Sequence, residues 1–420
     1  MSGHNSYELI TEELLKESLQ NDKGKKAKLL SWSIKDFTNK GDGYTSFVTS
    51  VTIKYMDAKI LSEVSYVLKL NPQRPISEMT DLAKDIFSRE KVILTDVLGA
   101  MSKHLERLNL APIKTPILFA SYLEQEKEAL VLENLRTQGF QMHERRIGHD
   151  YQHAFLVMEE LGRFHASSLL LEEAIAPKTF MEAFEYFEEP WFDVNNKTFK
   201  VFEKLITSHA EGAIKFLNVI PLYEKCVKWL NSHMQNLGRY FLEGFKSNKP
   251  FEVLAHGDCW TNNMLFKYNS KNTPVDVRFL DLQASRIASP AVDLNFYLYS
   301  SLTGKARSKY FQEYLYLYYE SFSKVLRLAQ REVPFPFKDL EIEVEKRRIL
   351  GLIIGIIALA SIINLEDDDI VSCDETTEDV EQFEEKRKKK FEKMSKKEEF
   401  KDRYLSIFDE MIQSNIFDEI

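Results

Sequence analysis

The stretch that decides the fold is residues 253–266, which read VLAHGDCWTNNMLF. An apolar run leads into a His-Gly-Asp triplet, and Asn263 follows Asp258 by five residues at the start of a second apolar run. A third run, VRFLDLQ at residues 277–283, carries Asp281. Short apolar runs bounded by turn residues are typical of buried strands. We therefore expect these three polar residues to stand at strand ends and to act together.

An Asp, an Asn five residues later and a second, later Asp form the residue set of a phosphotransferase catalytic loop and its metal site. Asp258 is predicted to take the proton of a substrate hydroxyl. Asn263 and Asp281 are predicted to bind Mg²⁺, which prefers hard oxygen ligands. His256 is predicted to support the loop through hydrogen bonds. The alternative is that Asp258 and Asn263 are buried polar residues satisfied by the backbone of a turn.

Composition excludes several other classes of protein. The chain has 420 residues, 44% hydrophobic and 12% aromatic, which is enough for a large core and excludes wholesale disorder. The net charge of −9 argues against nucleic acid or an anionic membrane as the main partner. Cys226, Cys259 and Cys373 make neither a disulfide framework nor a zinc pattern, which favours a reducing, cytoplasmic location.

One apolar run has to be weighed as a membrane span. Residues 349–363 are nearly all Ile, Leu, Ala and Gly, but a spanning helix needs about 20 apolar residues. Basic residues 346–348 and acidic residues 367–369 bound the run. We interpret it as a buried helix of a large helical lobe and expect no membrane span.

A glycine-containing segment separates the first two predicted strands, residues 29–37 and 47–55. It contains Gly41, Gly43 and Ser46. Glycine permits close approach of the backbone, so such a hairpin can lay N–H groups over phosphates. An ordinary hairpin turn has the same composition. Because a phosphotransferase motif follows later in the chain, we assign the three residues to a phosphate-binding hairpin.

Lys69 lies in the next predicted strand, residues 62–70, and Glu90 lies in the helix predicted at residues 77–98. In kinases, a strand lysine held by a helix glutamate contacts the α- and β-phosphates. The alternatives are a strand-end lysine that reaches water and a solvated helix glutamate. Their order after the glycine hairpin favours the pair.

Two more strand-like runs, residues 117–123 and 129–135, lead to Glu133 and Leu135. In a kinase, the adenine ring would hydrogen-bond to backbone groups at this point and stack between apolar side chains. We therefore place both residues at a nucleotide-binding hinge. A plain core strand is the alternative.

The rest of the chain is predicted to be mainly helical, with helices at residues 151–171, 177–187, 198–209 and 221–245. His165 is interpreted as a packed helix residue without a role. Asp293 fits a helix N-cap and an anchor for the catalytic loop equally well. Trp260 is either a wall for an apolar substrate, which we favour, or part of the core.

These elements predict an α+β fold with two lobes. Residues 1–132 form a small lobe with an antiparallel sheet and a helix. Residues 133–365 form a large, mainly helical lobe with the catalytic loop. Residues 366–420 form a charged tail, whose apolar spacing from residue 400 to 417 predicts a last helix that docks on the large lobe.

In order and spacing, the motifs resemble those of the aminoglycoside phosphotransferase and choline kinase group of the protein kinase-like fold. Protein kinases have Asp-Phe-Gly where this chain has Asp281-Leu282-Gln283. Five stretches resemble the ecdysteroid kinase-like (CHK kinase-like) family: residues 40–46, 131–135 with 139–140, 164–168, 256–263 and 279–283. The similarity covers about residues 30–365, with Asn134 where the family often has Asp and Gly43 where it usually has Asn.

The resemblance implies phosphorylation of a hydroxyl group, dependent on ATP and Mg²⁺. The acceptor would be a small, often lipophilic molecule such as an ecdysteroid or a xenobiotic. The competing hypothesis is a catalytically weak, pseudokinase-like protein that binds a ligand. A protein kinase is disfavoured because the activation-segment signatures do not occur. No motif specifies the acceptor or an oligomeric state.

Overall fold

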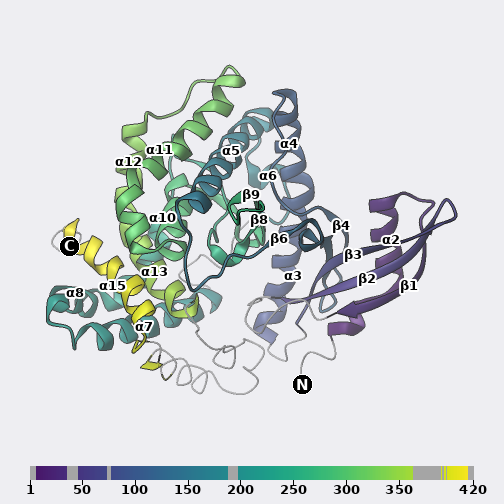
Figure 1. Ribbon diagram of the computed structural model, residues 1–420. Helices are drawn as coiled ribbons and strands as arrows, with labels where there is room; N and C mark the ends of the chain where they lie inside the picture. The colour runs from purple at the N-terminus through teal and green to yellow at the C-terminus, as the bar shows by residue number, and fades with distance from the viewer. Residues whose placement is uncertain are drawn as a thin grey trace.

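The computed structural model describes residues 6–35, 46–72, 77–187, 197–362, 389, 392–393 and 395–414. Gly41 and Gly43 lie outside the described residues. Figure 1 shows a sheet with one flanking helix on one side of the molecule and a large helical body on the other. The fold is α+β and kinase-like, as the sequence predicted.

The small lobe is a five-stranded antiparallel sheet in the order β1-β2-β3-β5-β4. Its strands are β1 (Lys28–Lys35), β2 (Phe47–Asp57), β3 (Ile60–Leu70), β4 (Leu118–Tyr122) and β5 (Ala129–Glu133). Helix α2 (Glu12–Lys23), capped by Thr11, covers one face of this sheet. Lys69 lies on the central strand, opposite Val48 of β2 and Leu130 of β5. Neighbours on both sides hold its backbone in place.

A long helical element connects the sheet to the large lobe. Helix α3 (Ser77–Val92) passes through a π-helical turn, η2 (Ile93–Val97), into α4 (Leu98–Arg107). The prediction of one helix over residues 77–98 was therefore right in place, but the element changes its hydrogen-bonding pattern after Val92 and continues to Arg107. Figure 1 shows α3 and α4 between the sheet and the helical body.

The large lobe is built from helices around one apolar core. They are α5 (Tyr151–Ile175), α6 (Phe180–Ala183), α7 (Lys197–Leu217), α8 (Glu224–His233), α9 (Leu237–Phe245), α10 (Pro290–Ser301), α11 (Gly304–Leu328), α12 (Phe337–Lys346) and α13 (Arg348–Ile362). Helices α5 and α11 pack closely at Gly162, where a Cβ atom would lie 2.6 Å from the Tyr318 carbonyl oxygen.

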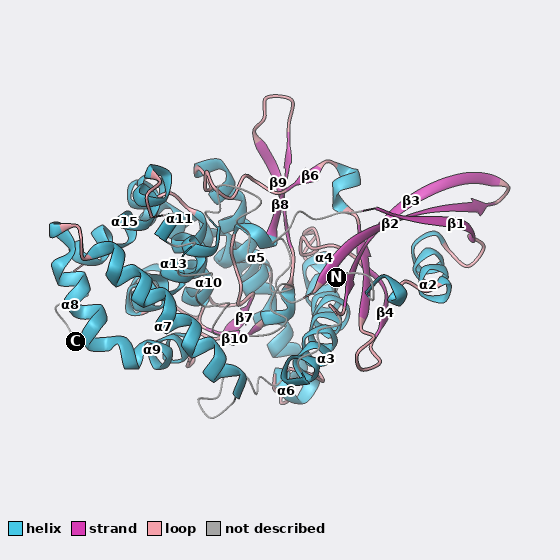
Figure 2. Cartoon of the chain, turned by 90° about the horizontal axis from the view of Figure 1, so that it is seen from below, coloured by secondary structure: helices cyan, strands magenta, loops and turns pink. Residues whose placement is uncertain are grey.

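Two small sheets carry the segments that contain Asp258, Asn263 and Asp281. Strand β7 (Val253–Ala255) pairs with β10 (Arg286–Ala288), and β8 (Met264–Tyr268) pairs with β6 (Phe140–Gln141) and β9 (Pro274–Phe279). Figure 2 shows the β8–β9 hairpin between the helical body and the five-stranded sheet. The three apolar runs that opened the sequence analysis are therefore strands, as predicted.

The helix predicted over residues 177–187 was largely wrong, because only Phe180–Ala183 is helical. Phe184 is extended and Tyr186 has a φ of 59°. The carbonyl oxygens of Tyr186 and Phe187 accept hydrogen bonds from the Arg89 side chain on α3. A contact with another lobe thus replaces the last helical turn. The helix predicted over residues 221–245 is likewise split by a 3₁₀ turn at Met234–Asn236.

The apolar run that was weighed as a membrane span is α13, which is buried in the large lobe. Among the described residues, no helix is both long and apolar enough to cross a membrane. The last helix is α15 (Glu398–Gln413), and it docks on the large lobe. Arg307, itself fully buried, holds Glu410 of α15, because its Nε–H donates to the two carboxylate oxygens at 2.9 and 2.8 Å.

Candidate active site

The His-Gly-Asp turn at the end of β7 depends on a glycine. Gly257 has a φ of 80°, a conformation that residues with a Cβ atom rarely adopt. A Cβ atom there would lie 2.1 Å from the Ala284 carbonyl oxygen, which follows Asp281 by three residues. The missing side chain therefore lets the Asp258 loop and the Asp281 loop lie in contact.

His256 joins the same two loops through its ring. Its Nδ1 accepts a hydrogen bond from the Asp258 backbone N–H at 3.3 Å, and its Nε2–H donates to the Leu280 carbonyl oxygen at 3.0 Å. This pairing requires a neutral ring that is protonated on Nε2. Burial agrees with it, because burial lowers the pKa of His256 and outweighs the nearby charge of Asp293. The side chain lies where a loop-supporting role requires it.

Asp293 lies directly behind the loop and is fully buried. Its two carboxylate oxygens accept the backbone N–H groups of His256 at 2.6 Å and of Gly257 at 2.9 Å. His165 of α5 lies 3.0 Å from the same carboxylate. Burial alone would raise the pKa of Asp293, but the hydrogen bond and charge of His165 lower it. Of the two functions left open for Asp293, the geometry is that of an anchor, since Ser289 caps α10.

Asp258 and Asn263 are in direct contact, as their spacing led us to expect. The Asn263 amide Nδ2 donates to Asp258 Oδ2 at 2.8 Å and to the Asp258 carbonyl oxygen at 3.0 Å. Burial, together with the negative charge of Asp281, raises the pKa of Asp258 to about 7, although bonds from Asn263 and Trp260 oppose the shift. A carboxyl group with a pKa near neutrality is suited to accept and release a proton.

Lys69, Glu90 and Asp281 form a charged cluster between the two lobes. Lys69 Nζ lies 2.5 Å from Glu90 Oε2 and 2.9 Å from Asp281 Oδ1. Burial alone would lower the pKa of Lys69, but the two carboxylates raise it, so the ammonium group stays charged. Lys69 and Glu90 are only 8% and 2% exposed. The structure thus brings together the three residues that the sequence placed at the phosphates and the metal.

The donor atoms on Asn263 and Asp281 suit a small, hard cation. Because Asn263 uses its amide nitrogen on Asp258, its Oδ1 is the atom available to a metal. Asp281 has a side chain that is 26% exposed, and its Oδ2 is 3.4 Å from Gln283 Nε2. Among the described residues, no three His, Cys, Asp or Glu side chains converge on a metal position. A magnesium ion held by one carboxylate, one amide and substrate phosphates fits this set.

The other described residues that were predicted to contact the nucleotide are Ser46, Glu133 and Leu135, and their side-chain contacts do not identify a role. Ser46 is buried just before β2. The Glu133 side chain accepts from the Ile117 backbone N–H and from Gln138 Nε2. Leu135 is buried against Leu265 and Leu280, and Leu280 directly precedes Asp281. The backbone at this hinge, rather than the Glu133 carboxylate, is therefore the part suited to a nucleotide base.

Trp260 is half-buried and packs against the core of the large lobe, while its side chain hydrogen-bonds to Asp258. This position is compatible with both functions considered for Trp260, a wall for an apolar substrate and a part of the core.

Two residues that link the elements of the site were not predicted from the sequence. His165 was given no role, yet it links Asp293 on α10 to the Tyr318 hydroxyl on α11. Arg89, next to Glu90, is 1% exposed and donates to the Ser285 carbonyl oxygen at 3.2 Å. An ionisable residue inside an otherwise apolar helical run was the available signal for His165. Nothing local marked Arg89, since its acceptors are backbone carbonyls remote in sequence.

The model of the ecdysteroid kinase-like family matches residues 40–331, well over half of the chain. A search of curated proteins gave no match. A solved structure of an ethanolamine kinase from Plasmodium vivax is similar to 89% of this chain and 83% of its own, with 14% identity and a TM-score of 0.39. The described fold, the lysine–glutamate pair and the family match are those of a small-molecule kinase. The chain therefore belongs to the ecdysteroid kinase-like family.

Proposed function

We propose that this protein transfers the γ-phosphate of ATP to a hydroxyl group of a small, lipophilic acceptor such as an ecdysteroid or a xenobiotic. The observation that carries the proposal is the Lys69 ammonium, which bridges Glu90 of the small lobe and Asp281 of the large lobe. A buried lysine placed between lobes, beside a carboxylate–amide pair, is the arrangement that phosphoryl transfer requires.

The roles follow from the contacts. Lys69 neutralises phosphate charge, and Glu90 fixes the lysine in place. A phosphate that enters the site competes with Asp281 for the Lys69 ammonium group. This competition releases Asp281 Oδ1 for a metal. A Mg²⁺ ion at this site would supply positive charge to offset the charge that develops on the phosphate oxygens. Asn263 and Asp281 would hold it through their side-chain oxygens.

Asp258 aligns the acceptor hydroxyl and takes its proton as the bond to phosphorus forms. Its raised pKa favours proton transfer near neutral pH. Asn263 fixes the carboxylate by donating to Oδ2, so that Oδ1 is left to face the acceptor. Most of the rate acceleration then comes from positioning and charge neutralisation, because the chemistry needs no covalent intermediate.

We also propose that the protein works in the cytoplasm. The two cysteines that the structure describes, Cys226 and Cys259, are buried and unbridged, which agrees with a reducing compartment.

The test is a turnover screen with ATP and Mg²⁺ against steroid, choline-like and phenolic alcohols, in which mass spectrometry detects the added phosphoryl group. Asp258→Asn should lower kcat by about 10³-fold while ATP still raises the melting temperature. Asp276→Asn, whose half-buried carboxylate pairs with Lys114 and Arg278, is the matched control. Near-normal turnover by Asp258→Asn would contradict the assigned base. ATP binding without turnover of any alcohol would instead favour a ligand-binding protein.

A further inference from the structure

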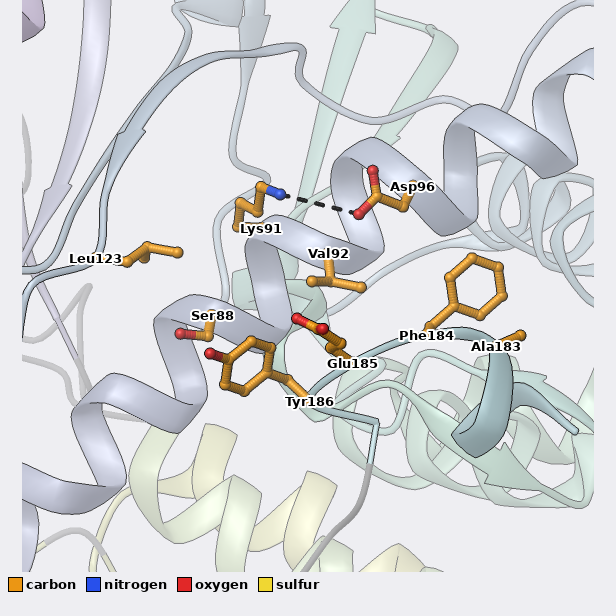
Figure 3. A pocket seen from close by; sticks show the side chains of 9 residues that line it. All are labelled: Ser88, Lys91, Val92, Asp96, Leu123, Ala183, Phe184, Glu185 and Tyr186. Atoms are coloured by element: carbon orange, nitrogen blue, oxygen red, sulfur yellow. Dashed lines mark ion pairs between the residues drawn. The ribbon is translucent and has the colours of Figure 1, made fainter.

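A cavity of about 470 Å³ lies between α3 and the segment that begins at the end of α6. Figure 3 shows Ser88 and Val92 on α3 facing Glu185 and Tyr186 of the segment after α6, with Phe184 and Leu123 at the sides. A volume of this size matches a drug-sized molecule. The lining residues are Ser88, Lys91, Val92, Asp96, Leu123, Ala183, Phe184, Glu185 and Tyr186.

The lining indicates the chemistry of a ligand. Ser88 is 1% exposed, and its hydroxyl has no hydrogen-bond partner among the described atoms. A buried hydroxyl without a partner is unfavourable, so a ligand that supplies one is stabilised. Val92, Leu123 and Phe184 provide apolar contact.

The charged groups of the lining do not favour a charged ligand. Lys91 Nζ and Asp96 Oδ2 lie 3.9 Å apart and largely cancel each other. Glu185 is exposed at the rim. The cavity thus suits an uncharged, mainly apolar molecule that bears a hydroxyl group.

Arg89 connects the cavity to the active site. Its guanidinium donates to the carbonyl oxygens of Tyr186 and Phe187 at 3.1 and 3.0 Å, on the segment that forms one wall. The same side chain donates to Ser285, four residues after Asp281. Glu90, the partner of Lys69, is the next residue on α3. A molecule that fixes the wall against α3 therefore also fixes the helix that presents Glu90.

We propose that this cavity is an effector site for an uncharged, hydroxyl-bearing apolar molecule, and that its occupation holds α3 with Glu90 on Lys69. The binding step is independent of the phosphotransfer proposed above, whereas the coupling step rests on that proposed function. Because coupling between sites is reciprocal, such a ligand raises nucleotide affinity, and nucleotide raises the affinity for the ligand.

Binding is tested on the full chain with 2-naphthol, a fluorescent uncharged alcohol, in the absence of nucleotide. Ala183→Trp and Leu123→Trp fill the cavity from two sides and should each raise the Kd by at least ~10-fold. Met181→Trp, exposed on the same helix as Ala183, should leave the Kd within about 2-fold of the wild-type value. Absence of binding by the wild-type protein, or equal binding by the filled variants, overturns the site.

Coupling is tested with a non-hydrolysable ATP analogue and Mg²⁺. Saturating 2-naphthol should lower the Kd of the analogue by about 5-fold, and Ala183→Trp should abolish this change. Arg89→Lys, which loses the forked contacts to three carbonyl groups, should reduce the change below about 2-fold. An unchanged analogue Kd in the wild-type protein overturns the effector role alone. Failure of the analogue to bind at all overturns the proposed function together with the effector role.

Discussion

Glu90 and Asp293 are both buried carboxylates of the active site, at 2% and 0% exposure, but their partners differ in kind. Glu90 faces one cation, Lys69, which has a second carboxylate partner in Asp281. Asp293 faces two backbone N–H groups and a histidine, which have fixed positions. The first arrangement can exchange partners when phosphate arrives, and the second cannot. We infer that Glu90 acts when phosphate is bound, whereas Asp293 holds the His256–Asp258 loop in its conformation.

The largest expected effect breaks the fixed network. Asp293→Asn replaces an oxygen by an amide NH₂ group, which must face one of three N–H donors in a fully buried place. The free energy of unfolding should fall by about 3 kcal/mol, measured by urea denaturation, because buried donors lose their acceptor. Asp276→Asn, whose half-buried carboxylate pairs with Lys114 and Arg278, should lower it by clearly less, because these partners are themselves half-buried and can bond to water instead. A loss in Asp293→Asn no larger than in this control would contradict the anchor.

The next prediction tests the contact between the two loops. Gly257→Ala forces a Cβ atom to within 2.1 Å of the Ala284 carbonyl oxygen at a φ of 80°. Unfolding free energy should fall by about 2 kcal/mol, and turnover should fall as the loops separate. The matched control is Gly99→Ala on α4, where nothing lies within 4 Å of the added atom. That variant should be unchanged or stabilised by up to about 1 kcal/mol. Equal stability of the two variants would show that the loops adapt.

Glu90→Gln tests the arrangement of Glu90, Lys69 and Asp281, whose ion pairs can exchange partners. Lys69 keeps its bond to Asp281, so the buried ammonium group is not left unpaired and the unfolding free energy should fall by less than in Asp293→Asn. With an acceptor from the turnover screen, kcat/KM should fall by about 10- to 100-fold, because the lysine is no longer held at the phosphates. Glu106→Gln on the exposed face of α4 is the control. A stability loss like that of Asp293→Asn would remove the distinction between the two carboxylates.

The same distinction explains which parts of the site could be predicted from the sequence. Asp258 and Asn263 are five residues apart, and a local spacing fixes their contact. Lys69 and Asp281 are 212 residues apart, but Lys69 lies in a strand and Asp281 follows one by two residues, so the order of elements brought them together. The fold followed from the same apolar periodicities.

The parts that were missed are held by contacts that leave no local pattern. The acceptors of Arg89 are the backbone oxygens of Tyr186, Phe187 and Ser285, and a carbonyl group is the same in every residue. The helix predicted over residues 177–187 failed for this reason, since its last carbonyls turn to Arg89. The partner of Asp293, His165, lies 128 residues away on another helix. Only packing of α5 against α10 and α11 shows that two lone ionisable residues belong together.

A second fixed network surrounds His149, which packs against His143 and His153 and hydrogen-bonds through its ring to the Tyr297 hydroxyl. Burial, followed by the charges of the two histidines and Arg403, lowers the pKa of His149 well below its usual value. The folded state therefore resists protonation, and stability present above pH ~6.5 should be lost as the pH falls below it. His149→Gln should reduce the slope of unfolding free energy between pH 6.5 and 5 by up to about 1.4 kcal/mol per pH unit. An unchanged slope in His149→Gln would show that this network, unlike that of Asp293, tolerates a charge.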